Sequence, residues 1–181
     1  MREEFERLYE TYHHALFQYL FYMVRNRETA EELVQEVYIK VLQSYKGFEG
    51  KSTEKTWLYS IAKHVAIDWM RSQNRKKRKW LGKQYELSER AFEMRDPAPL
   101  PDEIVEQNED VQYVYHMMER CTPDQKQVLI LRYVQAMSIQ ETASVLGWTE
   151  SKVKTTQHRA IKSLKKHLEN EESEGEEAKR R

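Results

Sequence analysis

The sequence predicts an all-α protein with two small helical domains joined by a flexible linker, the second domain being a helix-turn-helix. Glycine and proline are scarce, with 5 and 4 copies in 181 residues, which disfavours turn-rich β architecture. Apolar residues recur every three or four positions in several stretches, as they do on amphipathic helices. Most of the prolines lie within residues 97–101, and such a cluster is typical of a linker. We therefore expect a first domain at residues 1–72, a linker at 73–103, a second domain at 104–168 and a polar tail at 169–181.

Three helices are expected in the first domain. The first spans about residues 2–24 and is interrupted by Asn26, and the second spans about residues 28–46 with Gly47 as its C-terminal cap. The apolar stripe of the second helix comprises Ala30, Leu33, Val34, Val37, Val41, Leu42 and Tyr45. Ser52 would cap the third helix. The inner face of that helix comprises Trp57, Leu58, Ile61, Ala62, Val65 and Trp69, and the periodicity fades after Arg71.

The second domain carries clear helix-start signals. Its first helix begins near residue 102 and presents Ile104, Val111, Val114 or Tyr115, and Met118. Thr122 and Gln125 form a capping box around Pro123, which suits the first position of a helix. Ser138 and Glu141 form a second capping box. Each pair predicts that a helix starts at the following residue.

A helix-turn-helix is predicted at the end of the second domain. Helix 138–146 is followed by a turn with Gly147 and by helix 150–168, which Thr149 would cap. The inner stripe of the last helix comprises Val153, Ala160, Ile161, Leu164 and Leu168. In such a motif, outward polar groups near the start of the second helix enter the major groove of DNA. These groups are Ser151, Lys152, Lys154, Thr155, Thr156, His158 and Arg159.

Charge is balanced overall but segregated along the chain. There are 30 Lys and Arg residues and 30 Asp and Glu residues, so the whole chain has no net attraction for a polyanion. Residues 71–83 carry seven basic residues and no acidic one, and helix 150–168 carries six against one. Acidic residues concentrate in segments 28–36 and 102–110. Two basic segments suit contact with a polyanion at two places.

Enzyme chemistry and cofactor binding are not predicted. The single cysteine, Cys121, cannot form an internal disulfide, and no Cys and His cluster offers four zinc ligands, which indicates a reducing, cytoplasmic setting. His64 and Asp68 are four residues apart on one helix, but no third metal ligand is evident. The sequence contains no glycine-rich phosphate loop, signal peptide or membrane-spanning stretch. We therefore expect no cofactor, no metal site and no catalytic residue.

Four segments together resemble a known family. They are residues 32–38 (ELVQEVY), residues 48–52 (FEGKS), residues 56–68 (TWLYSIAKHVAID) and the helix-turn-helix. In this order they are similar to an extracytoplasmic-function (ECF) sigma factor of bacterial RNA polymerase, of the sigma-X type. The resemblance covers about residues 3–72 and 104–168. It implies a subunit that binds core RNA polymerase and directs promoter-specific initiation of transcription.

The resemblance also implies roles for particular residues. Core polymerase would be bound by Glu32, Gln35 and Glu36. Single-stranded DNA of the minus-ten promoter element would be bound by Phe48, Lys51, Ser52, Lys55, Lys63, His64 and Arg71. Double-stranded DNA of the minus-thirty-five element would be read by the recognition helix, with family contact positions at Lys154, Thr155, His158 and Arg159. The family further implies an anti-sigma factor, usually membrane-anchored, as a partner.

The sequence departs from the family pattern at three positions. His64 stands where many members have Asn, and Thr156 stands where Arg is common. Gln157 replaces a usual apolar residue on the inner side of the recognition helix. Two other readings remain open at this point: a stand-alone helix-turn-helix regulator, which would dimerise on palindromic sites, and a purely protein-binding module.

Overall fold

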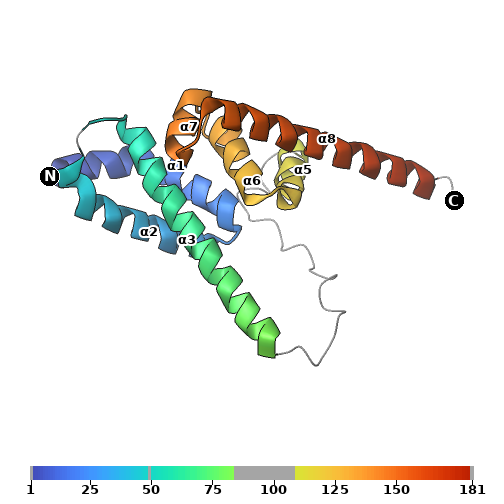
Figure 1. The fold of residues 1–181 in the computed structure, drawn as a ribbon, viewed down its shortest axis with the longest axis horizontal. Helices are drawn as coiled ribbons and strands as arrows, with labels where there is room; N and C mark the ends of the chain where they lie inside the picture. The colour runs from blue at the N-terminus through green and yellow to red at the C-terminus, as the bar shows by residue number, and fades with distance from the viewer. Residues whose placement is uncertain (1, 49, 84–108, 180–181) are drawn as a thin grey trace.

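The computed structural model describes residues 2–48, 50–83 and 109–179, and it is helical throughout these ranges apart from short connections (Figure 1). The first domain consists of α1 (Arg2–Val24), α2 (Arg27–Ser44), a 3₁₀ turn (Tyr45–Gly47) and α3 (Glu54–Lys83). The second consists of α5 (Glu109–Met117), a 3₁₀ turn (Met118–Arg120), α6 (Pro123–Leu129), the π-helical turn η3 (Ile130–Val134), α7 (Ile139–Leu146) and α8 (Glu150–Lys179). The predicted all-α class is confirmed. The predicted domain boundaries remain a prediction.

The three helices of the first domain share one apolar core. Leu8, Leu16 and Leu20 of α1 are fully buried, and Val37 and Val41 of α2 are buried with them. The buried residues of α3 are Leu58, Tyr59, Ala62, Val65 and Ala66.

Two of the predicted apolar faces in this domain need correction. Leu42 was expected on the buried stripe of α2 but is 49% exposed. The centre of the buried face of α3 lies at Leu58 and Ala62, while Trp57 and Trp69 are only partly buried at its edges. Trp57 instead packs against Phe48 of the preceding loop, with ring centroids 4.8 Å apart.

The helix ends of the first domain agree only partly with the prediction. Asn26 starts α2, since its side chain accepts a hydrogen bond from the Thr29 amide (2.8 Å). The cap of α3 is Thr53 and not Ser52, because the Thr53 hydroxyl accepts from the Thr56 amide (3.1 Å). Gly47 does not end α2, which stops at Ser44 and is followed by the 3₁₀ turn.

Two helices run further than the sequence periodicity predicts. The third helix continues past Arg71 to Lys83, and α8 continues through the polar tail to Lys179. Both extensions consist mainly of Lys, Arg, Glu and other good helix formers, which can stay helical without an apolar face to bury. Figure 1 shows both extensions projecting from the body of the molecule.

The helix starts of the second domain confirm the predicted capping boxes. Thr122 accepts from the Gln125 amide (3.3 Å), while the Gln125 side chain accepts from the Thr122 amide (3.1 Å). Ser138 and Glu141 make the same reciprocal pair at 3.0 and 2.7 Å. Thr149 accepts from the Lys152 amide and starts α8 as expected (3.2 Å). Of the predicted positions on the preceding helix, Tyr115 and Met118 are buried and Val114 is exposed, while Ile104 lies outside the described residues.

The two domains pack directly against each other. The third helix lies along α7, and α1 contacts η3 (Figure 1). At one edge of this interface the Arg25 guanidinium is 2.6 Å from the Glu119 carboxylate and 4.1 Å from the centre of the Tyr115 ring. Arg25 has a φ of 58°, a left-handed backbone conformation that is uncommon for a residue other than glycine.

The turn of the helix-turn-helix depends on the backbone conformation of Gly147. Gly147 ends α7 with a φ of 67°, a conformation that costs an L-residue roughly 1–2 kcal/mol. We therefore expect Gly147→Ala to lower the free energy of unfolding by about 1 kcal/mol, measured by urea denaturation of the full chain. Gly47→Ala is the matched control, because Gly47 has an ordinary φ and open space at its Cβ, and it should not lower stability. Equal stability of Gly147→Ala and the wild type would contradict this account.

Candidate functional site

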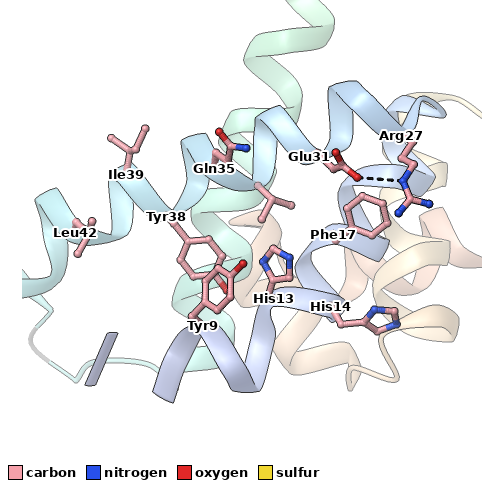
Figure 2. Close-up of a pocket in the computed structure, with 11 residues that line it drawn as sticks. Tyr9, His13, His14, Phe17, Arg27, Glu31, Gln35, Tyr38, Ile39 and Leu42 are labelled. Carbon is pink, nitrogen blue, oxygen red and sulfur yellow. Dashed lines mark hydrogen bonds and ion pairs between the residues drawn. The ribbon is translucent and has the colours of Figure 1, made fainter. Parts of the chain in front are cut away.

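An open groove of about 730 Å³ runs between α1 and α2 (Figure 2). The aromatic rings of Tyr9, His13 and Tyr38 form its floor, and the Tyr9 and His13 ring centroids are 4.4 Å apart. At one end, the Arg27 guanidinium donates to the Glu31 carboxylate (3.0 Å). This groove is therefore partly aromatic and carries its charges at the rim.

The predicted polymerase-binding residues lie beside this groove. Glu32, Gln35 and Glu36 are all exposed, and Gln35 lines the groove itself. Because residues three and four apart share one face of a helix, this polar set forms a single stripe on α2 that continues to Ile39. Ile39 is 54% exposed, and Leu42 at the end of the groove is 49% exposed. Leu42 was predicted to be buried, because an apolar residue at this spacing on an amphipathic helix is assigned to the core, and Ile39 was given no role.

The predicted minus-ten residues of α3 do not lie on one face. His64 and Arg71 face solvent, and the His64 ring donates from Nδ1 to the Ser60 backbone oxygen (2.6 Å). Lys55 and Lys63 lie on the side of α3 that meets the second domain and are both partly buried. In the preceding loop, Lys51 and Ser52 are exposed and Phe48 is partly buried.

Two lysines of α3 donate hydrogen bonds to backbone oxygens of the second domain. Lys55 Nζ donates to the backbone oxygen of Gln135 and Lys63 Nζ to that of Leu146, both at 3.4 Å. Burial lowers the pKa of Lys63, because the charged ammonium has lost part of its water. In this arrangement one donor of each ammonium is directed at the second domain, and both side chains are partly covered by it.

Gln135 is the centre of the contact between the domains. Only 8% of this residue is exposed, and its side chain lies between α1 and α3. Its amide oxygen accepts from the Tyr59 hydroxyl (2.5 Å), and its amide nitrogen donates to the Gln18 side chain (3.2 Å). Gln135 was not predicted as a site residue, because a lone glutamine between two predicted helices carries no periodic signal.

The backbone around Gln135 is unusual. The chain leaves α6 through η3, and the Gln135 amide donates to the Ile130 oxygen five residues earlier (2.9 Å). The next residue, Ala136, has a φ of 50°. Both features are uncommon and tend to occur at functional positions. Here they direct the Gln135 side chain into the first domain.

The predicted DNA-reading groups are arranged on the exposed side of α8. Ser151, Lys152, Lys154, Thr155, His158 and Arg159 are exposed, whereas Thr156 is partly buried. Lys152 Nζ lies 3.7 Å from the centre of the Trp148 ring, so this lysine is held against the turn. The recognition face of α8 is therefore open while the two domains are in contact.

Gln157 has a polar role that the sequence did not indicate. It stands at a position expected to be apolar, but its amide oxygen accepts from Arg132 Nε (3.0 Å) and its amide nitrogen donates to the Tyr133 hydroxyl (3.1 Å). Gln157 thus joins α8 to η3 beside the recognition face.

Within the ranges that the structure describes, no three His, Cys, Asp or Glu side chains gather closely enough to hold a metal ion. Cys121 is a buried free thiol, and burial raises its pKa. None of the helices in these ranges is both long and apolar enough to cross a membrane.

Comparison with known proteins identifies both domains. The family model for sigma-70 region 2 matches residues 8–76, and that for sigma-70 region 4 matches residues 112–164. The ECF RNA polymerase sigma factor SigX of Bacillus subtilis is 53% identical over 169 residues, which cover 93% of this chain and 86% of that protein. The RNA polymerase sigma factor YlaC of the same organism is 32% identical, covering 92% of this chain and 93% of that protein.

Solved structures share the fold. The sigma factor RpoE of Bartonella quintana, solved with the anti-sigma factor NepR, has a TM-score of 0.74 at 22% identity and covers 92% of this chain and 98% of that one. CnrH, solved with the cytosolic domain of CnrY, has a TM-score of 0.68 at 17% identity and covers 94% of this chain and 90% of that one.

The chain therefore belongs to the ECF sigma factors of the sigma-70 family, which direct RNA polymerase to initiate transcription and are not enzymes. The match to region 2 accounts for the segments that a stand-alone helix-turn-helix regulator would leave without a role.

The Gln135 contact predicts how the two domains respond to substitution. We call the arrangement in which the two domains are in contact the closed arrangement. Gln135→Leu keeps the side-chain volume but leaves the Tyr59 hydroxyl without its partner, which destabilises the closed arrangement by about 1–3 kcal/mol. We expect broader and longer distances between spin labels at Glu10 and Ser144, measured by pulsed electron resonance. Gln140→Leu, an exposed glutamine on α7, is the matched control and should leave the distances unchanged. Identical distances in Gln135→Leu and the wild type would show that Gln135 does not hold the domains together.

Proposed function

We propose that this sigma factor binds core RNA polymerase through the stripe of Glu32, Gln35, Glu36 and Ile39 on α2 and the adjoining groove. The observation that carries this proposal is the continuity of exposed acidic groups with exposed apolar side chains on one helix face. Isolated charges at a surface add little affinity, whereas apolar side chains that become buried supply the binding energy that charges then orient. The partner surface should accordingly be basic around an apolar centre.

We further propose two contacts with promoter DNA. The loop at Phe48, Lys51 and Ser52, together with residues on α3, would hold the single-stranded minus-ten element. An aromatic pair such as Phe48 and Trp57 offers a surface on which an unstacked base can lie. The recognition face of α8 would read the double-stranded minus-thirty-five element in the major groove.

The arrangement of the domains supports an order of events. In the closed arrangement the recognition face of α8 is exposed to solvent. Lys55 and Lys63, in contrast, donate hydrogen bonds to backbone oxygens of the second domain. The proposed single-strand site is therefore incomplete until the domains separate. Binding of core polymerase would supply the free energy for this separation by preferring the open arrangement.

Two proposals concern the cellular setting. The chain would act in the cytoplasm with RNA polymerase, which fits its single unpaired cysteine. An anti-sigma factor, which could be membrane-anchored, would control it, since the structures of similar fold from Bartonella quintana and of CnrH were solved with protein partners. An anti-sigma factor that contacts both domains would favour the closed arrangement.

The polymerase proposal is tested by charge reversal on α2. The Glu32→Lys/Glu36→Lys double variant should lose most of its affinity for core polymerase, because it replaces attraction for a basic surface with repulsion. The matched control is Glu10→Lys/Glu28→Lys, which makes the same change of charge at exposed sites outside the groove and should bind normally. Both variants should keep the helical circular dichroism of the wild type. Equal affinity of the two double variants for core polymerase would overturn the docking site.

The reading of the upstream element predicts different roles for two cations on α8. Lys154 and Arg159 are five residues apart and therefore point about 140° apart around the helix axis. With Lys154→Ala in the holoenzyme, one position of the element should lose about 1–3 kcal/mol of base preference. Arg159→Ala should weaken binding to all sequences alike and reduce the salt slope by about 0.9, as expected for a phosphate contact. Salt titrations on substituted elements measure both effects, and a base-specific loss in Arg159→Ala alone would reverse the assignment.

A further inference from the structure

Arg132, Gln157 and Tyr133 form a chain of hydrogen bonds that ends at the surface. Arg132 Nε donates to Gln157 Oε1 (3.0 Å), and Gln157 Nε2 donates to the Tyr133 hydroxyl oxygen (3.1 Å). Arg132 is also anchored on its other side, since its guanidinium donates to the backbone oxygen of Met137. This series links η3 to α8 and does not belong to the predicted set of DNA-reading groups.

The direction of these bonds is determined by chemistry. An arginine side chain has only donors, so the group that faces Arg132 must be the amide oxygen of Gln157. The amide nitrogen of Gln157 then faces Tyr133 and can only donate, so the Tyr133 oxygen accepts. The hydroxyl proton of Tyr133 must therefore point away from Gln157. The hydroxyl group of Tyr133 can therefore donate a hydrogen bond to a group on the side away from Gln157.

Tyr133 lies at the edge of the recognition face. It is 58% exposed, so its hydroxyl group can reach a ligand from solvent. Gln157 follows Lys154 by three residues and lies about 60° from it around the axis of α8. A side chain bound to Gln157 is accordingly beside the groove-facing stripe and outside it, in the direction of the sugar-phosphate backbone that borders a major groove.

We propose that Tyr133 donates a hydrogen bond to a phosphate oxygen of the upstream promoter element, and that Gln157 and Arg132 orient its hydroxyl for this contact. The inference rests on the proposed binding of that element by α8. Tyrosine hydroxyls are regular phosphate donors in protein–DNA complexes, where such contacts set the register of the protein without reading sequence. Because Tyr133 is neutral, its contact releases no counterion from the DNA.

The test compares affinity and salt dependence in the holoenzyme. Tyr133→Phe removes only the hydroxyl, and we expect about 5- to 10-fold weaker binding to the upstream element, equal on base-substituted elements. The salt slope should stay unchanged, which distinguishes a neutral donor from a cation such as Arg159. Tyr22→Phe, in the first domain, is the matched control and should bind like the wild type.

A second variant tests the orientation by Gln157. Gln157→Glu keeps a partner for Arg132, but its carboxylate can only accept, so the Tyr133 proton would turn inward. In the Gln157→Glu background, Tyr133→Phe should cause no further loss of affinity for the upstream element. Additive losses from the two substitutions would contradict the orientation of Tyr133 by Gln157. If Tyr133→Phe binds like the wild type while Lys154→Ala and Arg159→Ala still weaken binding, the proposed phosphate contact of Tyr133 is wrong but the proposed DNA binding by α8 stands. If all three variants bind normally, the proposed use of α8 fails with it.

Discussion

The buried contact of Gln135 with Tyr59 and Gln18 lies at the centre of the interface between the two domains of this sigma factor. Both polar atoms of the Gln135 side chain have a partner in the first domain, and buried hydrogen bonds of this kind favour one arrangement of the domains. The same network is easily reversible, because each group finds water when the domains separate. The interface also has an apolar part, since Phe21 and Tyr22 of α1 pack against Tyr115 of α5, with ring centroids 6.2 and 5.3 Å apart.

The consequences of this contact differ between the two proposed DNA sites. Closing the domains removes Lys55 and Lys63 from the single-strand site, while His64 and Arg71 stay in solvent. The recognition face of α8 is unaffected. The proposed polymerase-binding stripe on α2 is exposed as well. On this proposal, polymerase can bind the protein while the domains are still in contact, before melted DNA is held. This asymmetry would keep the free protein from binding single strands without its enzyme.

The sequence predicted those features that local chemistry determines. The capping boxes at Thr122 and Ser138 and the turn at Gly147 were predicted because each depends on residues within one helical turn. The ends of α3 and α8 were not, because apolar periodicity marks where a helix packs and not where it stops. The exposure of Leu42 was not predicted either, because apolar periodicity does not distinguish a residue buried in the core from one that remains at the surface. Gln135 could not be found, because its partners are 76 and 117 residues away.

The central claim is that the free protein is closed and that core polymerase opens it. Single-molecule fluorescence energy transfer between dyes at Glu10 on α1 and Ser144 on α7 measures this directly, in the free chain and after assembly with core polymerase. The account predicts high transfer efficiency in the free protein and a shift of the whole population to low efficiency in the holoenzyme. The same high efficiency in both samples would contradict it, since Lys55 and Lys63 would then remain covered in the assembled enzyme.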